Sequence, residues 1–219
     1  NVVEGISFEE ANKARFEKVI KREIKSSALD AITPEKIESA KKVVGENGGA
    51  LTELAKFGLR RQEVNKFRLS DIAKEEGKDG RYYIDTSKIK KKGTVTRPLL
   101  IPKTLAEKLF ALRDLTIDDL GKVPKNRNRV MFGGKKIEKV VDGKKVKRGI
   151  LAEVGEHIWG KGANYRDART ILSQLGLKAK SFSPEEVGFT IGDVQGAVAK
   201  IYQMRDMPLR EQLDIIERV

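Results

Sequence analysis

The sequence has no cysteine and only one histidine, His157. The absence of cysteine excludes disulfide bonds and thiolate metal sites, and a lone histidine leaves no zinc cluster. No stretch approaches the roughly 20 apolar residues of a membrane-spanning helix, and the start at Asn1 lacks a signal-peptide pattern. We therefore expect a soluble intracellular protein without a metal. Because the chain does not begin with Met, we also expect it to be a piece of a longer protein.

Positive charge is what the sequence has in excess. Its 219 residues include 45 Lys and Arg against 32 Asp and Glu, which gives a formal net charge of +13 and a pI near 9.8. Such a balance favours polyanionic partners, although ribosomal, RNA-binding and membrane-surface proteins can be equally basic. The apolar share of 39% is enough for a hydrophobic core, and the length suits one large domain with a short leading segment.

Helical patterns occur along most of the chain. Residues 8–25 carry apolar side chains at helical spacing, and Thr33 followed by Pro34 predicts the start of a new helix. We therefore place a boundary near residue 32. Glycines within residues 45–49 predict the end of that new helix, and another helical face follows. Further helices are expected at about 103–115, from 150 onward, at 190–203 and at 206–217.

Strand signals lie in the middle of the chain. Residues 81–85 and 94–101 are rich in β-branched and aromatic side chains, which predicts two strands joined by a basic connection. Pro98 cannot donate to a strand ladder, so it favours an edge position. Asp142 and Gly143 predict a tight hairpin turn.

Four short stretches carry the chemistry, and they occur in one order: GLRRQE at residues 58–63, a lysine run at 88–92, RDART at 166–170, and Tyr202. Two separated arginines and a lysine can neutralise one phosphodiester. A tyrosine hydroxyl can attack the phosphorus and form a covalent intermediate. This chemistry requires no metal and no nucleotide, so we expect no cofactor.

In their order and spacing these stretches resemble the tyrosine recombinase (phage integrase) family over roughly residues 33–210. The resemblance implies an α+β, mainly α catalytic fold with a small antiparallel β-sheet for residues 33–219. Residues 1–32 would then be a linker or the end of a preceding DNA-binding segment.

The first box of the family resembles residues 58–64 followed by the sequence LSDI at 69–72. By resemblance, Arg60 is the first catalytic arginine and binds a non-bridging oxygen of the scissile phosphate. Glu63 would be an acid that helps to hold the site. Arg61 is the competing candidate and is otherwise assigned to DNA binding. The alternative for Arg60 is a structural arginine at a helix end that pairs with Glu63.

The catalytic lysine of the family lies on a β-hairpin turn before a run that ends in Ile-Pro or Val-Pro. Here Lys92 has that place, because residues 97–102 read RPLLIP. Its role would be that of a general acid that protonates the leaving 5′ oxygen. Lys90 and Lys91 are alternatives for this role and are otherwise expected to bind DNA.

The second box normally reads His-x-x-Arg, and residues 166–169 have its shape with Arg166 in place of the histidine. Arg166 could donate to a phosphate oxygen but could not accept a proton at ordinary pH. Lysine has this place in the related type IB topoisomerases, so a cation is compatible with the chemistry. Arg169 keeps the second phosphate-binding arginine.

The last box normally has Gly-His or Gly-Trp about nine residues before the nucleophile. Asp193 has this place before Tyr202. Asp193 either forms a hydrogen bond with the site or, with Thr190, caps the start of the helix that carries the tyrosine. Tyr202 itself is either the nucleophile or part of a buried helix stripe. His157 fits neither histidine position of the family.

Seven Lys and Arg lie between residues 135 and 148, around the predicted hairpin. Lys144 and Lys145 could contact DNA if this hairpin is a flap. The alternative is a solvated surface loop.

The resemblance thus implies a site-specific DNA recombinase or integrase of a mobile element that acts on double-stranded DNA through a 3′-phosphotyrosyl intermediate. Such enzymes work as homo-tetramers, in the cytoplasm at the nucleoid or in the host cell of the element, and not at a membrane. One alternative keeps the chemistry but changes the outcome, as in telomere resolvases or type IB topoisomerases. Another is a recombinase-like protein that has lost catalysis and only binds DNA, which the missing histidines favour.

Overall fold

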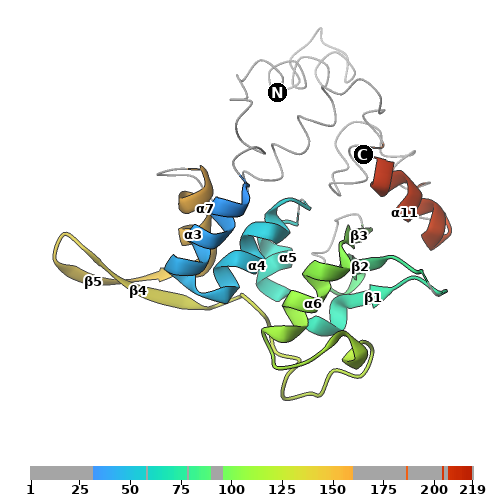
Figure 1. The fold of residues 1–219 in the computed structure, drawn as a ribbon, viewed down its shortest axis with the longest axis horizontal. Helices are drawn as coiled ribbons and strands as arrows, with labels where there is room; N and C mark the ends of the chain where they lie inside the picture. The colour runs from blue at the N-terminus through green and yellow to red at the C-terminus, as the bar shows by residue number, and fades with distance from the viewer. Residues whose placement is uncertain are drawn as a thin grey trace, which may run out of the picture.

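The computed structural model describes residues 32–57, 59–77, 79–89, 96–159, 186, 204 and 207–218. They form a mixture of helices and two small antiparallel sheets (Figure 1). The α-helices are α3 (Pro34–Val44), α4 (Glu46–Ala55), α5 (Arg61–Lys66), α6 (Lys103–Ala111), α7 (Ile150–Trp159) and α11 (Leu209–Arg218). The strands are β1 (Ile72–Lys74), β2 (Tyr82–Asp85), β3 (Pro98–Ile101), β4 (Lys136–Val141) and β5 (Lys144–Gly149). Short 3-10 helices span Leu69–Asp71 (η1), Thr86–Lys88 (η2) and Ile117–Asp119 (η3).

Helix α3 begins as its sequence predicts. The Thr33 hydroxyl accepts a hydrogen bond from the Lys36 backbone N at 3.3 Å, and Pro34 has the first helical position. The helix ends at Gly45, whose φ of 70° favours glycine. The expected helices at residues 8–25 and 190–203 lie outside the described residues, and the domain boundary near residue 32 stays a prediction.

The break predicted for residues 45–49 is wrong in its extent, because α4 already starts at Glu46. Gly48 and Gly49 lie inside this helix, where they let α4 pack closely against α3. A Cβ atom on Gly48 would overlap the carbonyl oxygen of Ala40. Gly48 is therefore needed for helix packing and not for a turn.

Substitution of Gly48 by Ala is expected to lower the free energy of unfolding by roughly 1–3 kcal/mol, the usual cost of overpacking. The added methyl group meets rigid backbone of α3. Gly49→Ala is the matched control, because its Cβ would meet only the flexible side chain of Lys41 while the helix gains propensity. Urea denaturation of both variants gives the comparison. Equal stability of the two would contradict the packing argument.

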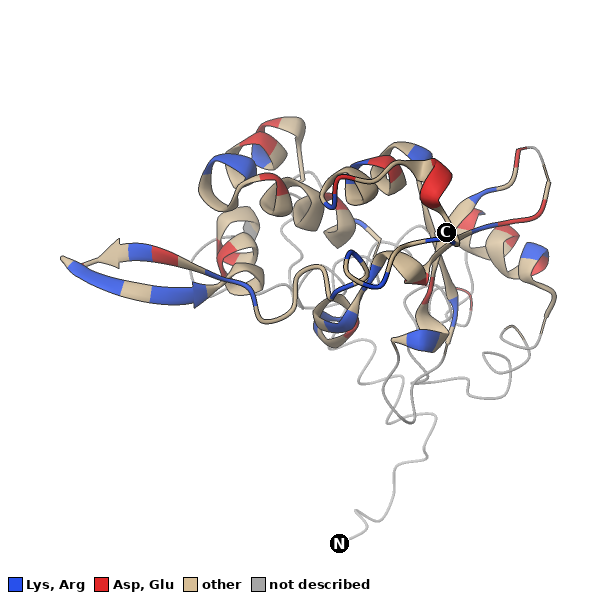
Figure 2. Ribbon diagram, turned by 90° about the horizontal axis from the view of Figure 1, so that it is seen from below, with Lys and Arg blue, Asp and Glu red and all other residues tan. Residues whose placement is uncertain are grey.

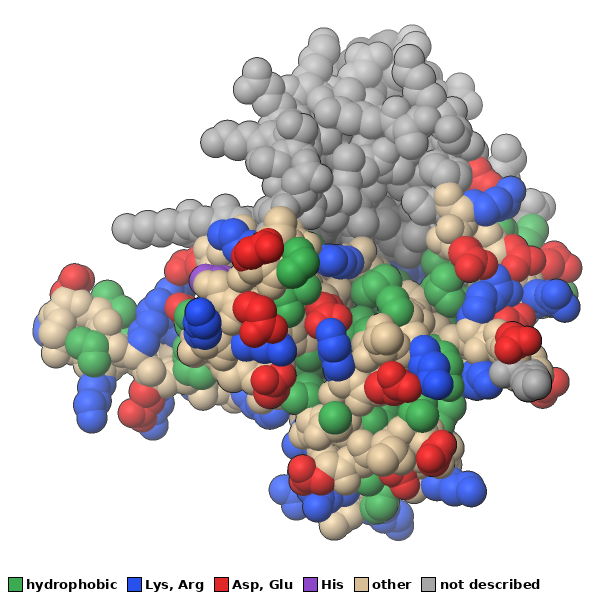
Figure 3. All heavy atoms as spheres, viewed as in Figure 1, with side chains coloured by type: hydrophobic (Ala, Val, Ile, Leu, Met, Phe, Trp, Pro, Cys, Tyr) green, Lys and Arg blue, Asp and Glu red, His purple; other side chains and the backbone are tan. Residues whose placement is uncertain are grey.

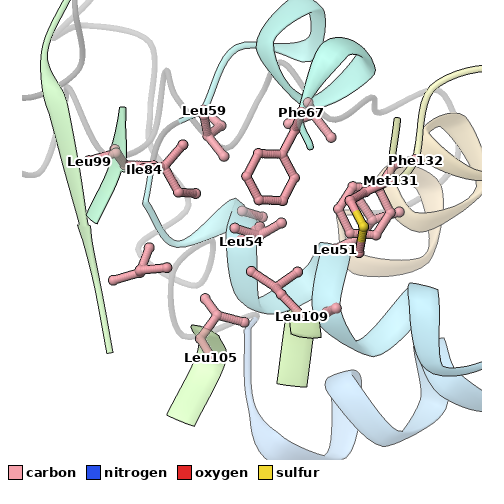
Figure 4. Packing of buried hydrophobic residues seen from close by; sticks show 14 of the residues in the cluster. Leu51, Leu54, Leu59, Phe67, Ile84, Leu99, Leu105, Leu109, Met131 and Phe132 are labelled. Atoms are coloured by element: carbon pink, nitrogen blue, oxygen red, sulfur yellow. The ribbon is translucent and has the colours of Figure 1, made fainter. Parts of the chain in front are cut away.

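The three-stranded sheet has the order β1-β2-β3 and is antiparallel throughout. Pro98 begins β3 at one edge, as predicted. Ile72, Ile84 and Leu99 are paired across the strands and are all buried. This face of the sheet belongs to the main core, where side chains of the sheet, α4 and α6 converge (Figure 4).

The core also holds the loop that follows α6. The rings of Phe67 and Phe132 stack at 6.2 Å between centroids, and the Met131 backbone N donates to the Phe67 carbonyl oxygen at 2.8 Å. Helix α6 ends at Ala111, earlier than its apolar spacing predicts, and a turn follows with Asp114 at a φ of 54°.

Helix α11 packs on the other side of β3. Ile215 and Ile216 pack with Leu100, which points away from the main core because it follows Leu99 in the strand. At the rim, the Arg81 guanidinium binds Asp214 at 2.7 Å and Glu217 at 2.8 Å. The predicted closing helix thus covers the sheet of its own chain.

Strands β4 and β5 form a separate hairpin, as the Asp-Gly pair predicts. Asp142 and Gly143 both have positive φ values, of 49° and 74°. A type I′ hairpin turn requires positive φ at both of its central residues. The hairpin projects from the body of the molecule on the side away from the three-stranded sheet (Figure 1). No helix of the described residues is both long and apolar enough to span a bilayer.

Candidate active site

The structure describes five of the residues that the sequence nominates: Arg60, Arg61, Glu63, Lys144 and Lys145. The other nominated residues lie outside the described part of the chain: Lys90, Lys91, Lys92, Arg166, Arg169, Asp193 and Tyr202.

Arg60 and Glu63 are brought together at the start of α5. The backbone N of Arg60 donates to Glu63 Oε2 at 2.7 Å, so the carboxylate caps the helix. The guanidinium Nη1 of Arg60 lies 3.6 Å from Glu63 Oε1. The Arg60 side chain is 19% exposed and that of Glu63 only 3%. A short local motif therefore both starts the helix and fixes the direction of the arginine.

Arg97 is the residue of this cluster that sequence reasoning missed. Its side chain is completely buried, and its Nη1 atom lies 3.6 Å from the same Glu63 Oε1 that faces Arg60. One carboxylate oxygen of Glu63 thus faces two arginines, Arg60 and Arg97, that are far apart in the sequence. One signal was present, because Arg97 directly precedes an apolar strand and therefore has a place at the edge of the core.

Within the cluster, the Glu63 carboxylate faces the guanidinium groups of both Arg60 and Arg97. Burial lowers the pKa of the Arg97 guanidinium, the nearby Glu63 carboxylate raises it, and the charge of Arg60 lowers it further. Arginine still stays protonated near neutral pH because its reference pKa lies above 12. Arg60 is the member of the cluster that reaches solvent, and a guanidinium is a group that binds phosphate oxygens.

The base of the lysine segment is joined to this cluster. The Thr86 hydroxyl donates to the Arg97 carbonyl oxygen at 2.6 Å and accepts from the Arg97 backbone N at 2.9 Å. Thr86 and Arg97 lie at the two ends of the β2–β3 connection, which contains the lysine run. Their hydrogen bonds therefore hold these two ends together. Where this run begins, Lys88 Nζ donates to the Ser70 carbonyl oxygen at 3.3 Å. The two ends of the connection are thus joined at Arg97, whose side chain contacts Glu63.

The chain that follows Tyr202 returns to the same region. Met204, two positions after the tyrosine, packs with Ile215 and Ile216 of α11, the pair that also contacts Leu100 of β3. A hollow at the base of the lysine segment is lined by Arg97 and Thr96 on one side and by Leu209 and Gln212 of α11 on the other.

Arg61 differs from Arg60 in its surroundings. It is the first residue of α5 and is exposed, whereas Arg60 is partly buried beside Glu63. Of the two, only Arg60 is paired with Glu63 in the described structure. The two competing candidates are therefore distinguishable by geometry.

Lys144 and Lys145 lie on the β4–β5 hairpin, whose strand β5 packs on α7 and which projects from the body of the molecule (Figure 2). His157 lies in the last turn of α7, where its carbonyl oxygen accepts from Lys36 Nζ at 3.3 Å. Burial lowers the pKa of its imidazole, and the charge of Lys36 lowers it further. None of these three residues belongs to the arginine cluster. The described residues hold no group of three or more His, Asp or Glu that could bind a metal ion.

Comparison with known proteins adds no relative. No family model, no curated protein and no solved structure matches this chain.

Proposed function

We propose that this protein cleaves and rejoins double-stranded DNA by the chemistry of tyrosine recombinases. Tyr202 attacks the scissile phosphorus, its phenol proton passes to solvent, and a 3′-phosphotyrosyl bond forms as the bond to the 5′ oxygen breaks. Lys92 protonates that leaving oxygen. Arg60, Arg166 and Arg169 stabilise the charge on the phosphate oxygens. A 5′ hydroxyl then attacks the phosphotyrosyl bond and reverses the step.

One observation carries this proposal: the cluster of Arg60, Glu63 and Arg97 at the base of the lysine segment. A buried carboxylate between two arginines restrains the guanidinium of Arg60, so less conformational freedom is lost when a phosphate binds. The connection that bears Lys92 is anchored at Arg97. In support of this, Glu63 of the first stretch contacts Arg97, whose backbone is hydrogen-bonded to Thr86, two positions before the lysine run.

The position of the C-terminal segment gives further support. Helix α11 packs on β3, whose first residue follows Arg97 directly, and Met204 packs with Ile215 and Ile216 of α11. The segment that follows the tyrosine is therefore tied to the sheet that is joined to the lysine segment. As partners we propose double-stranded DNA and further copies of this chain, as a tetramer on paired sites. The corresponding location is the nucleoid or the host cell of a mobile element.

The proposal is tested by trapping the covalent intermediate on nicked duplex DNA from which the 5′ end diffuses away. Denaturing gels are expected to show a protein–DNA adduct with the unchanged protein and none with Tyr202→Phe. Tyr165→Phe, which makes the same change at a tyrosine outside the motif, is the control and should retain the adduct. Tight DNA binding without any adduct would refute cleavage and favour the DNA-binding alternative. The trapped products separate strand exchange from hairpin formation.

A further inference from the structure

The β4–β5 hairpin carries more positive charge than its packing uses. Residues 135–148 contain seven Lys and Arg, and the strands project from α7 with basic and apolar side chains on their surface (Figures 2 and 3). Each strand has six residues, so the arm reaches about 20 Å at the usual rise of a strand.

Cations near the base of the hairpin are neutralised by acidic groups and anchor it. Arg148 binds Glu156 through two contacts of 2.7 Å, and Lys139 Nζ lies 2.7 Å from Glu153 Oε1. Both acids belong to α7. These ion pairs fix the orientation of the hairpin relative to α7.

The outer half of the hairpin has a different composition. Lys144 and Lys145 are exposed, and among the described residues neither forms an ion pair with an acidic group. Beside them, Val140 is 67%, Val141 40% and Val146 39% exposed. Val140 and Val141 lie opposite Lys145 and Lys144, whereas Lys147, next to Val146, is paired with Glu138 at 3.4 Å. The outer end of the hairpin therefore groups exposed apolar and basic side chains, a combination that favours an interaction surface.

The register places the two lysines on opposite faces of the ribbon. Lys145 is paired with Val140, and Lys144 with Val141, and side chains of neighbouring residues in a strand point to opposite faces. A narrow ribbon with a cation on each face can contact the phosphates on both sides of a groove. The major groove, about 12 Å wide, admits a two-stranded ribbon.

We propose that the β4–β5 hairpin is an arm that binds duplex DNA outside the cleaved phosphodiester, with Lys144 and Lys145 on phosphates and the valines against the groove. DNA as the partner rests on the proposed function. A second copy of this hairpin is disfavoured because it would place lysines against lysines. The arm is separated from the arginine cluster, so it adds affinity and footprint and takes no part in the chemistry.

The test replaces both lysines, in the double variant Lys144→Gln/Lys145→Gln, and measures binding to duplex DNA by fluorescence anisotropy at several salt concentrations. Loss of two phosphate contacts is expected to reduce the slope of log K against log salt by about 1.8, and to lower affinity about tenfold at low salt. Lys122→Gln/Lys125→Gln, the same charge change at exposed residues of the loop after α6, is the control and should keep the slope.

The outcomes separate this proposal from the proposed function. With saturating DNA, the hairpin variant is expected to form the covalent adduct like the unchanged protein. An unchanged slope in the hairpin variant would overturn the DNA-binding arm and favour an acidic protein partner instead. Equal losses in both double variants would also overturn it, because the effect would then be one of net charge. If the unchanged protein forms no adduct while the slope effect of the hairpin variant is retained, cleavage alone is refuted.

Discussion

Replacement of Arg60 by Lys is expected to slow DNA cleavage by about 100- to 1000-fold, the usual cost of losing one well-placed donor to a developing oxyanion. Lysine keeps the charge but loses the planar fork that binds two phosphate oxygens. Single-turnover rates of adduct formation at saturating DNA give the measurement. Because the backbone N of residue 60 still donates to Glu63, the helix cap is retained and the variant should fold.

Arg61→Lys is the matched control for Arg60→Lys. It makes the same change at the next residue, which is exposed and is not paired with Glu63 in the described structure. We expect its cleavage rate to stay within about threefold of the unchanged protein, as for other surface substitutions. The reverse result, a large loss in Arg61→Lys and none in Arg60→Lys, would assign the first catalytic arginine to position 61.

Substitution of Glu63 by Gln is expected to lower the free energy of unfolding by about 3–5 kcal/mol, the cost of removing one partner from a buried ion pair. Gln retains the size of Glu and can still accept from the Arg60 backbone N, so the loss reports mainly the missing charge. Arg97 is fully buried and would lie beside Arg60 without the carboxylate.

Denaturant unfolding of Glu63→Gln is compared with Glu107→Gln, which removes an ion pair between exposed side chains on α6. The control should lose about 1 kcal/mol or less. Adding Arg97→Leu to Glu63→Gln should recover part of the stability, because the buried guanidinium that faced the carboxylate is then gone as well. If Glu63→Gln is as stable as the control, the buried cluster is not an energetic unit.

The parts of the fold that the sequence predicted are those controlled by local chemistry. Thr33 and Pro34 start a helix, Asp142 and Gly143 close a hairpin, and Pro98 marks an edge strand, each through neighbouring backbone groups. The capping role of Glu63 is also local, because its carboxylate accepts from the backbone N of Arg60, three positions earlier. Contacts of this range are encoded in a few consecutive residues.

What could not be predicted depends on contacts between distant segments. Gly48 resembles a helix breaker until α3 lies against it. Arg97 resembles an ordinary strand residue until α5 brings Glu63 within 3.6 Å of it. The separation of the hairpin cations into anchored and unneutralised groups depends on where α7 places Glu153 and Glu156. These features depend on how distant segments pack together, so no run of consecutive residues predicts them.

The central claim is that Tyr202 becomes covalently bound to a DNA 3′ phosphate, and mass spectrometry of the trapped adduct tests it most directly. After nuclease digestion, trypsin should release residues 201–205, since Lys200 and Arg205 flank a peptide with one tyrosine. We expect the mass of this peptide to increase by that of a 3′-linked nucleotide. The same modification on residues 82–88, which hold Tyr82 and Tyr83, or on residues 162–166, which hold Tyr165, would contradict the assignment of the nucleophile.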